Sequence, residues 1–246
     1  MQRKLWLWAL LGLLTYSGCT ISNVENAPEI KVYFDSVGVK GCFALYDNNR
    51  GEFVINNRDR YLQRFPAGST FDIATALIGL QTGALFNAKT QLGGQTLAEA
   101  FRSDTAGYFR QLTVRIGQDN FRRWMDSLAY GNKRLDSPTI SPDEQLGLVK
   151  RMFFNQLSFQ KTTQEVVVSA MKQENTPLYS LAYVAGSAPG DSASEGWVVG
   201  WVEESVHPYF FVLNIEKNTK GEDLSALSAV LLRKILASQG FFKGVK

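Results

Sequence analysis

Alternating hydrophobic and polar positions mark both ends of this chain, whereas its middle has helical spacing. The segments "GCFALYD" (residues 41–47) and "EFVIN" (residues 52–56) alternate with a period of two, and the turn-forming "NNRG" joins them. This arrangement predicts a β-hairpin. We interpret "IKVYF", residues 30–34, as a further early strand. Three late segments rich in β-branched and aromatic residues predict strands at residues 178–186, 196–204 and 209–216.

Between these ends, apolar residues recur at the spacing of amphipathic helices. Helices are predicted at residues 72–85, 97–109, 120–128, 141–157 and 162–174. Ser141 and Glu144 form the pattern of a capping box at the start of the fourth helix. A closing helix is predicted over residues 224–240, with Gly240 at its end.

Strands from both ends and helices between them predict an α+β fold. We expect an antiparallel sheet flanked by helices, built from about residues 29–67 and 178–246. Residues 68–177, approximately, are expected to form a helical lobe. The whole domain then spans residues 29–246.

The first residues have the pattern of a bacterial export signal. A positive start is followed by the apolar run "LWLWALLGLLTY" (residues 5–16) and by small residues that end at Cys19. We expect residues 1–18 to be removed and Cys19 to be lipidated, which would anchor the chain in a membrane. The alternative is an ordinary cleaved signal in which Cys19 has no role. Residues 19–28 are expected to be a polar tether.

Charge and composition exclude several functions. Removing residues 1–18 takes away Arg3 and Lys4 and no acidic residue, so the net charge falls from +3 to +1. A nearly neutral chain argues against a nucleic-acid partner. Cys42 is expected to be a small buried side chain, and His207, the only histidine, to lie in a hairpin turn. No cysteine and histidine cluster has the spacing of a zinc site, and no cofactor is expected.

The segment "PAGSTFDIATALIGL" (residues 66–80) poses the central chemical question. Ser69 stands before an apolar helix, with Asp72 one turn later. Such a serine can cap the helix, with the aspartate in its positive first turn. It can equally be an exposed nucleophile, which then needs a base within hydrogen-bond reach.

Several motifs in order along the chain bear on this choice. "FALYD", "FPAGSTFDIATALIGLQTGAL", "YGN", "ISPDEQLGLVKRM", "TQEVVVSAMKQE" and "GWVVGWVE" together resemble class D (oxacillinase-type) serine β-lactamases and related penicillin-recognising domains. The resemblance covers nearly all of residues 30–240. It implies a β-lactamase/transpeptidase-like fold with the site between sheet and helical lobe. It also implies a Ser-x-x-Lys mechanism, in which the serine attacks the lactam and a carboxylated lysine acts as the base.

The chain departs from the pattern of this family at the residues that carry charge. Ser69 matches the nucleophile, but Asp72 occupies the lysine position. The second motif, Ser-x-Val, reads Asp104-Thr105-Ala106, and the Lys-Thr-Gly strand motif reads Val184-Ala185-Gly186. No basic residue lies between Asp223 and Leu232, the segment around Ser228 where the resemblance implies an arginine that grips the substrate carboxylate. The loop after Asn132 is only "KRLDSPT" and lacks the tryptophan that shields the lysine in this family.

These departures lead us to expect that the chain keeps the fold of the family but lacks the charged groups that its hydrolase site needs. An aspartate with a pKa near ~3.9 accepts a serine proton poorly. Our leading hypothesis is a catalytically inactive lipoprotein that serves as a binding or scaffolding module in the bacterial cell envelope, with a peptidoglycan fragment or an envelope protein as partner. One alternative is a serine hydrolase of β-lactams or cell-wall peptides that uses Ser69 with an altered base.

A third hypothesis is a sensor whose acidic cleft binds a cationic cell-wall fragment. Ser69, Asp72, Asp104 and Tyr130 would line that cleft. The resemblance also places Asn132, Trp197 and the segment 184–186 at the binding site. Trp197 and Trp201 are four residues apart on a predicted strand, so they face the same side, and we expect both to pack in the core.

Overall fold

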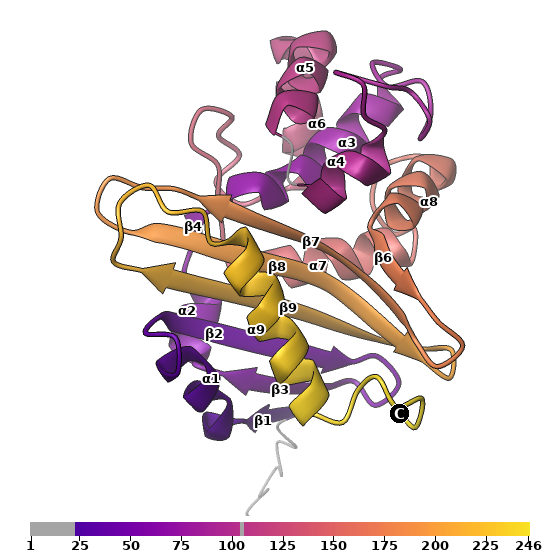
Figure 1. The fold of residues 1–246 in the computed structure, drawn as a ribbon. Helices are drawn as coiled ribbons and strands as arrows, with labels where there is room; N and C mark the ends of the chain where they lie inside the picture. The colour runs from indigo at the N-terminus through magenta and orange to yellow at the C-terminus, as the bar shows by residue number, and fades with distance from the viewer. Residues whose placement is uncertain (1–22, 104–105) are drawn as a thin grey trace, which may run out of the picture.

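The computed structural model describes residues 23–103 and 106–246. A seven-stranded sheet crosses the molecule in the order β1-β3-β2-β9-β8-β7-β6 (Figure 1). Its early strands are β1 (Val24–Asn26), β2 (Lys40–Asp47) and β3 (Glu52–Asn56). Its late strands are β6 (Lys172–Asn175), β7 (Ser180–Ala188), β8 (Ser194–Glu204) and β9 (His207–Lys217). Neighbouring strands are antiparallel except for β1, which pairs with β3 in parallel.

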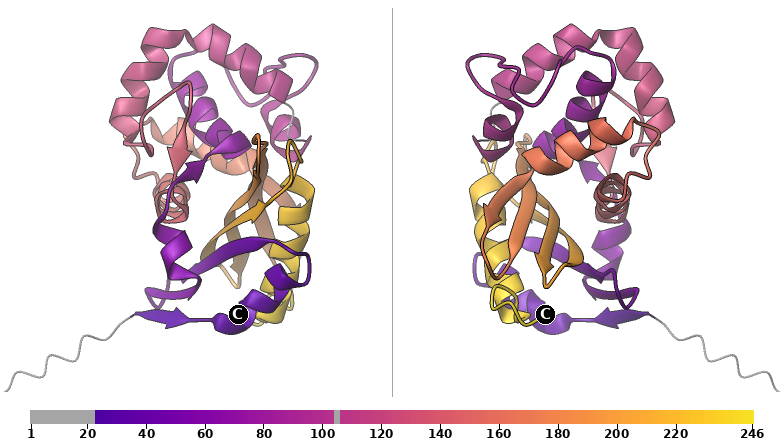
Figure 2. Two further views of the ribbon diagram at one scale, coloured as in Figure 1. Left: turned by 90° about the vertical axis from the view of Figure 1, so that its left-hand side faces the viewer. Right: turned by 90° about the vertical axis from the view of Figure 1, so that its right-hand side faces the viewer.

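Helices cover both faces of the sheet, and the alternation along β9 shows why. Phe211 and Leu213 join a core with α9 (Ser225–Ser238), α1 (Lys31–Asp35) and the short helix η1 (Pro28–Ile30). Phe210 and Val212 face the other way, into a core shared with α7 (Pro142–Phe153) and the helical lobe. Both layers are visible edge-on in Figure 2.

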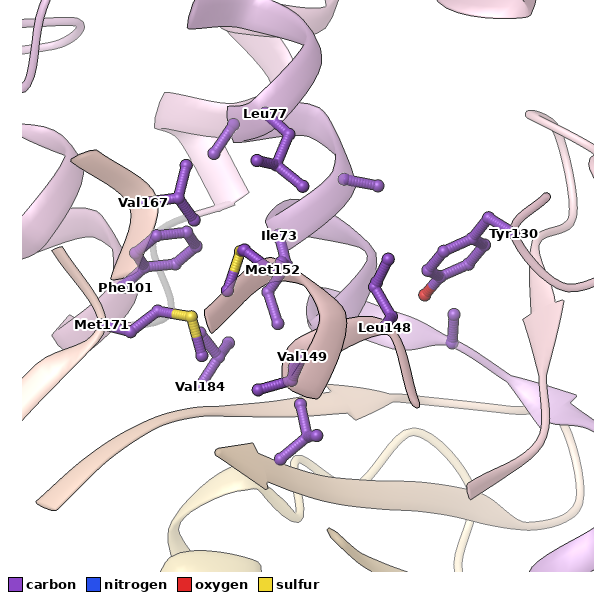
Figure 3. Packing of buried hydrophobic residues seen from close by; sticks show 14 of the residues in the cluster. Ile73, Leu77, Phe101, Tyr130, Leu148, Val149, Met152, Val167, Met171 and Val184 are labelled. Carbon is purple, nitrogen blue, oxygen red and sulfur yellow. The ribbon is translucent and has the colours of Figure 1, made fainter. Parts of the chain in front are cut away.

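The helical lobe consists of α3 (Asp72–Gln81), α4 (Leu97–Ser103), α5 (Ala106–Ile116), α6 (Gln118–Leu128) and α8 (Lys161–Ala170). Helix α3 is its centre, since every residue from Ile73 to Gly79 is buried. Ile73 and Leu77 of α3 lie in the same core as Met152 of α7 and Val184 of β7 (Figure 3). The start of α3 is therefore held between the sheet and the other helices.

Much of the predicted architecture is confirmed. β2 and β3 form the predicted hairpin, and the three late strands lie within two residues of their predicted bounds at either end. The Ser141–Glu144 capping box is present at α7. Cys42, Trp197 and Trp201 are fully buried in the core, as expected. The hairpin turn before β9 consists of residues 205–206, so His207 is the first strand residue after that turn.

Other predictions about the fold are wrong. Residues 30–34, expected as a strand, lie in η1 and α1, because Ile30 and Phe34 are one helical turn apart and both bury against α9. The expected tether contains strand β1, which pairs with β3. The helix expected at residues 162–174 ends at Ala170, and β6 follows it because β7 offers a free edge for pairing.

Helix bounds also differ at three places, one of which is α7, which ends at Phe153, four residues before its predicted end. The helix predicted over residues 97–109 is two helices, α4 and α5. Helix α3 ends at Gln81, four residues before its predicted end. In the parts of the chain that the structure describes, no helix has both the length and the apolar character to cross a membrane.

Candidate active site around Ser69

The backbone that leads to Ser69 is fixed from three directions. Phe65 and Pro66 form β4, which pairs with β5 (Thr139–Ile140). The backbone N–H of Ala67 donates to the carbonyl of Pro138 at 2.9 Å. The indole Nε1 of Trp197 donates to the carbonyl of Pro66 at 2.9 Å. The buried Trp197 is therefore a structural support of the site.

Two glycines allow strand β7 to lie directly against the turn that carries Ser69. A Cβ added to Gly186 would lie 2.9 Å from the Cβ of Ser69 and 2.9 Å from the backbone nitrogen of Thr70. A Cβ added to Gly68, which has a φ of +52°, would lie 2.4 Å from the carbonyl oxygen of Ser187. The glycine of the altered strand motif is thus required by close backbone approach.

The two residues before Gly186 do not supply chemistry. Val184 is buried in the core beneath α3, and Ala185 packs on the opposite side of the sheet. Neither side chain can donate a hydrogen bond or carry a charge. At this edge of the site, strand β7 therefore contributes backbone groups and no cation.

Ser69 lies in the 3-10 helix η2 (Gly68–Phe71), immediately before α3, and is partly exposed. The interpretation of Ser69 as a helix cap is wrong, because the residues at the cap positions of η2 and α3 are Ala67 and Phe71 and no side chain caps either helix. No hydrogen bond joins the Ser69 hydroxyl to another described residue. Within the described chain, no lysine or other base is seated against this oxygen.

Asp72 is the first residue of α3, where its negative charge is favoured by the helix dipole. Its charge also acts on Tyr130. Burial, and then the charge of Asp72, raise the pKa of the Tyr130 hydroxyl far above its ordinary value. Tyr130 is therefore a neutral phenol, and the structure brings Ser69, Asp72 and Tyr130 together at the start of α3.

A buried amide, which the sequence analysis missed, connects these elements. The hydroxyl of Tyr130 donates to Oε1 of Gln145 at 3.1 Å, and Nε2 of Gln145 donates to the carbonyl of Thr70 at 3.4 Å. Tyr130 points its hydroxyl inward toward Leu148 (Figure 3). Gln145 is fully buried on α7, one turn after Ser141, and a polar residue at a core position of the helical pattern was the available signal.

Asn132 holds the short loop that follows Tyr130. Its Nδ2 donates to the carbonyl of Ser137 at 2.9 Å, and its Oδ1 accepts from the backbone nitrogens of Arg134 and Thr139 at 3.1 Å each. These bonds occupy the side chain that the resemblance assigned to ligand binding. The loop of residues 133–138 is thus a compact, internally bonded turn.

Ser228 does not reach the site. It is fully buried on α9, its hydroxyl donates to the carbonyl of Leu224 at 2.8 Å, and it packs against Gly196. Asp104 and Cys19 lie outside the described residues. Among the residues that are described, no group of three histidine, cysteine or acidic side chains could hold a metal ion.

A buried ion cluster, which the sequence did not reveal, supports strand β4, which leads to Ser69. Arg60 on α2 (Arg58–Leu62) donates to Glu195 at 2.7 Å, to Glu216 at 3.0 Å and to Asn214 at 2.8 Å. Its guanidinium also lies 4.0 Å from the centre of the Phe65 ring. Burial outweighs the attraction of Arg60 and raises the pKa of Glu195 to about 7. The cluster fixes β4, and through it the turn of Ser69.

Comparison with known proteins identifies the relatives of this fold. A solved class D β-lactamase, YbXI from Nostoc, is 27% identical, with a TM-score of 0.77 over 86% of this chain and 98% of its own. The C-terminal domain of the penicillin receptor BlaR from Bacillus licheniformis is 27% identical, with a TM-score of 0.79 over 89% of this chain and 97% of its own. The chain is a homologue of class D β-lactamases and of this penicillin-receptor domain.

Curated sequences agree with this relationship. Probable β-lactamase YbxI from Bacillus subtilis is 27% identical over 92% of this chain and 96% of its own length. Regulatory protein BlaR1 from Bacillus licheniformis is 27% identical over 91% of this chain, which spans only 41% of that protein. No family model matches the chain. Because one fold carries both enzymes and receptors here, function has to be argued from the site.

Proposed function

We propose that this class D β-lactamase homologue is a catalytically silent binding module of the cell envelope. One observation carries the proposal: the Ser69 hydroxyl has no base among the described residues, and Asp72 stands where a lysine amine would be expected. The scaffold around the serine is intact, whereas the chemical groups that would activate it are replaced.

The replacement of an amine by a carboxylate opposes catalysis twice. A carboxylate is a much weaker base than an amine and takes a serine proton poorly. Its negative charge also repels the charge that develops on the carbonyl oxygen in acyl transfer. The effect of Asp72 on the pKa of Tyr130 indicates that this charge is felt within the site.

Loss of cationic groups weakens the binding of an anionic substrate as well. Val184 is apolar and buried, and Ser228 is turned into the helix–sheet contact, so neither can hold a carboxylate. Each lost charged hydrogen bond is worth roughly 1.5–3 kcal/mol. Two such losses correspond to a decrease in affinity of roughly a hundredfold to ten-thousandfold.

The class of ligand follows from the negative charge that replaced these cationic groups. The negative charge of Asp72 at the start of α3, beside the partly exposed Ser69, favours an amine-bearing cell-wall fragment over a β-lactam carboxylate. With the chain anchored through a lipidated Cys19, helices α5 and α6 would face away from the membrane, because β1 lies at the end of the molecule opposite them (Figure 2). Thermal shifts with muropeptides should be lost in Asp72→Asn, and equal shifts in both proteins would contradict this assignment.

One observation favours an alternative, acylation of Ser69 without turnover. Ser69 is partly exposed on a turn that Gly186, Gly68 and Trp197 hold in place, as a nucleophile requires. The similarity to a penicillin receptor supports the same alternative.

Penicillin labelling separates these functions. The full chain is treated with fluorescent penicillin and with nitrocefin, and intact mass is measured beside Ser69→Ala. We expect no adduct, and no nitrocefin turnover above the Ser69→Ala background. A stable adduct on Ser69 would establish the receptor function, and turnover that depends on Ser69 would establish a hydrolase. Either result would refute the silent module.

A further inference from the structure

A second cavity lies outside the Ser69 site, between α5, α6 and the loop of residues 133–138. Its volume is about 420 Å³, within the roughly 300–1,000 Å³ that is usual for small-molecule sites. The lining side chains are mainly apolar or aromatic and come from three separate segments: Phe71, Thr113, Val114, Phe121 and Leu135.

The walls of this cavity are suited to a hydrocarbon chain. The rings of Phe71 and Phe121 are stacked, with centroids 5.7 Å apart and an interplanar angle of 24°. Val114, at the rim on α5, is 78% exposed. An apolar ligand that covered Val114 and the exposed part of Phe71 would gain roughly 25 cal/mol for each Å² of apolar surface removed from water.

The acidic side chains around the cavity already have basic partners. Asp136, which lines the cavity, is paired with Arg134 at 2.8 Å. Asp119, at the start of α6, lies 4.0 Å from Arg122. Arg110 is exposed one helical turn before Val114, on the same face of α5.

No described residue forms an ion pair with Arg110. The segment around the cavity is also positively charged overall, because residues 106–139 contain six basic and three acidic side chains. An anionic head group above the cavity is therefore complementary to this rim.

We propose that this cavity binds the anion of a medium-chain fatty acid. The hydrocarbon chain lies between Val114, Leu135 and the stacked rings of Phe71 and Phe121, and the carboxylate pairs with Arg110. The cavity is not lined by Ser69, Asp72 or Tyr130, so it operates whether or not Ser69 is chemically silent.

The experiment is photo-crosslinking of the full chain, in isolated membranes, with a dodecanoic acid probe that carries a diazirine on its chain. We expect saturable labelling of peptides that contain residues 113–121 or 135, competed by dodecanoate but not by dodecyltrimethylammonium. Val114→Glu should reduce labelling at least tenfold. The matched control Val230→Glu, at a half-exposed valine on α9, should leave it unchanged.

Further variants separate charge from fold and this site from the serine. Arg110→Glu should weaken labelling about tenfold, and Arg110→Lys should largely preserve it. Ser69→Ala should label like the natural chain. Non-saturable labelling, labelling that maps elsewhere, or equal competition by the cationic amphiphile would overturn the proposal.

Discussion

The contact between Gly186 and the turn of Ser69 makes the most direct test of the site's construction. In Gly186→Ala, the new Cβ would stand 2.9 Å from the Cβ of Ser69, 2.9 Å from the nitrogen of Thr70 and 3.1 Å from the carbonyl carbon of Ser69. Cβ contacts shorter than 3.0 Å essentially do not occur in folded proteins. Two of these three contacts are with backbone, so the conflict cannot be relieved by a change of rotamer.

The expected cost follows from overpacking. Inserting one carbon into a well-packed contact costs roughly 1–3 kcal/mol. For a chain of this size, each kcal/mol corresponds to a decrease of roughly 2–4 °C in the melting temperature. We therefore expect Gly186→Ala to melt roughly 2–12 °C below the natural chain.

Thermal and urea unfolding followed by circular dichroism would measure this loss, with Gly147→Ala as the matched control. Gly147 lies inside α7, and a Cβ there meets nothing within 4 Å. Alanine at that position should stabilise the chain by roughly 0.5–1 kcal/mol, because it has the higher helix propensity. If Gly186→Ala were as stable as the natural chain, β7 and the serine turn could not be as close as the structure places them.

Four further outcomes are expected. Asp72→Lys alone should not produce nitrocefin turnover, because the other cationic groups are also absent; turnover would show that the base is the sole missing part. The pKa of Glu195 is raised by burial to about 7 from 4.5, so the stability that its protonated form contributes is complete below pH 4.5 and is lost as pH rises through 7. The free energy of unfolding should accordingly fall across this window in urea titrations, and Glu195→Gln should flatten the profile. Ser141→Ala removes the capping box of α7 and should cost roughly 0.5–2 kcal/mol in the same assay. Burial raises the pKa of Cys42 to about 12, so its thiol should react with a disulfide reagent only after unfolding.

The strands and helices that sequence predicted correctly have strong local signals. Strands β8 and β9 are rich in β-branched and aromatic residues, and α7 begins with a capping box. Strand β6 shows the opposite case. Its sequence, "KQEN", favours helix over strand, but pairing with β7 satisfies its backbone. Long-range pairing overrode local propensity there.

At the site, the sequence identified Ser69, Asp72 and Tyr130 as neighbours, because these residues lie in recognisable motifs. It could not identify Gln145 or the Arg60 cluster. Arg60 on α2 lies more than a hundred residues before Glu195 on β8 and Glu216 on β9. Only folding brings the Arg60 guanidinium within 3.0 Å of both carboxylates, so no local pattern could reveal the cluster.

The sequence by itself determined the β2–β3 hairpin, the three late strands, the position of the serine turn, and the replacement of an amine by a carboxylate at Asp72. These are properties of residue type and short-range spacing. The tertiary structure decided that Ser69 is a partly exposed hydroxyl instead of a helix cap, and that Gly186 is required by β7. It also decided that a second, apolar cavity opens beside Phe71. Burial, pairing and cavity formation depend on segments that are distant in the chain, and the free energy of each contact exists only once those segments have met.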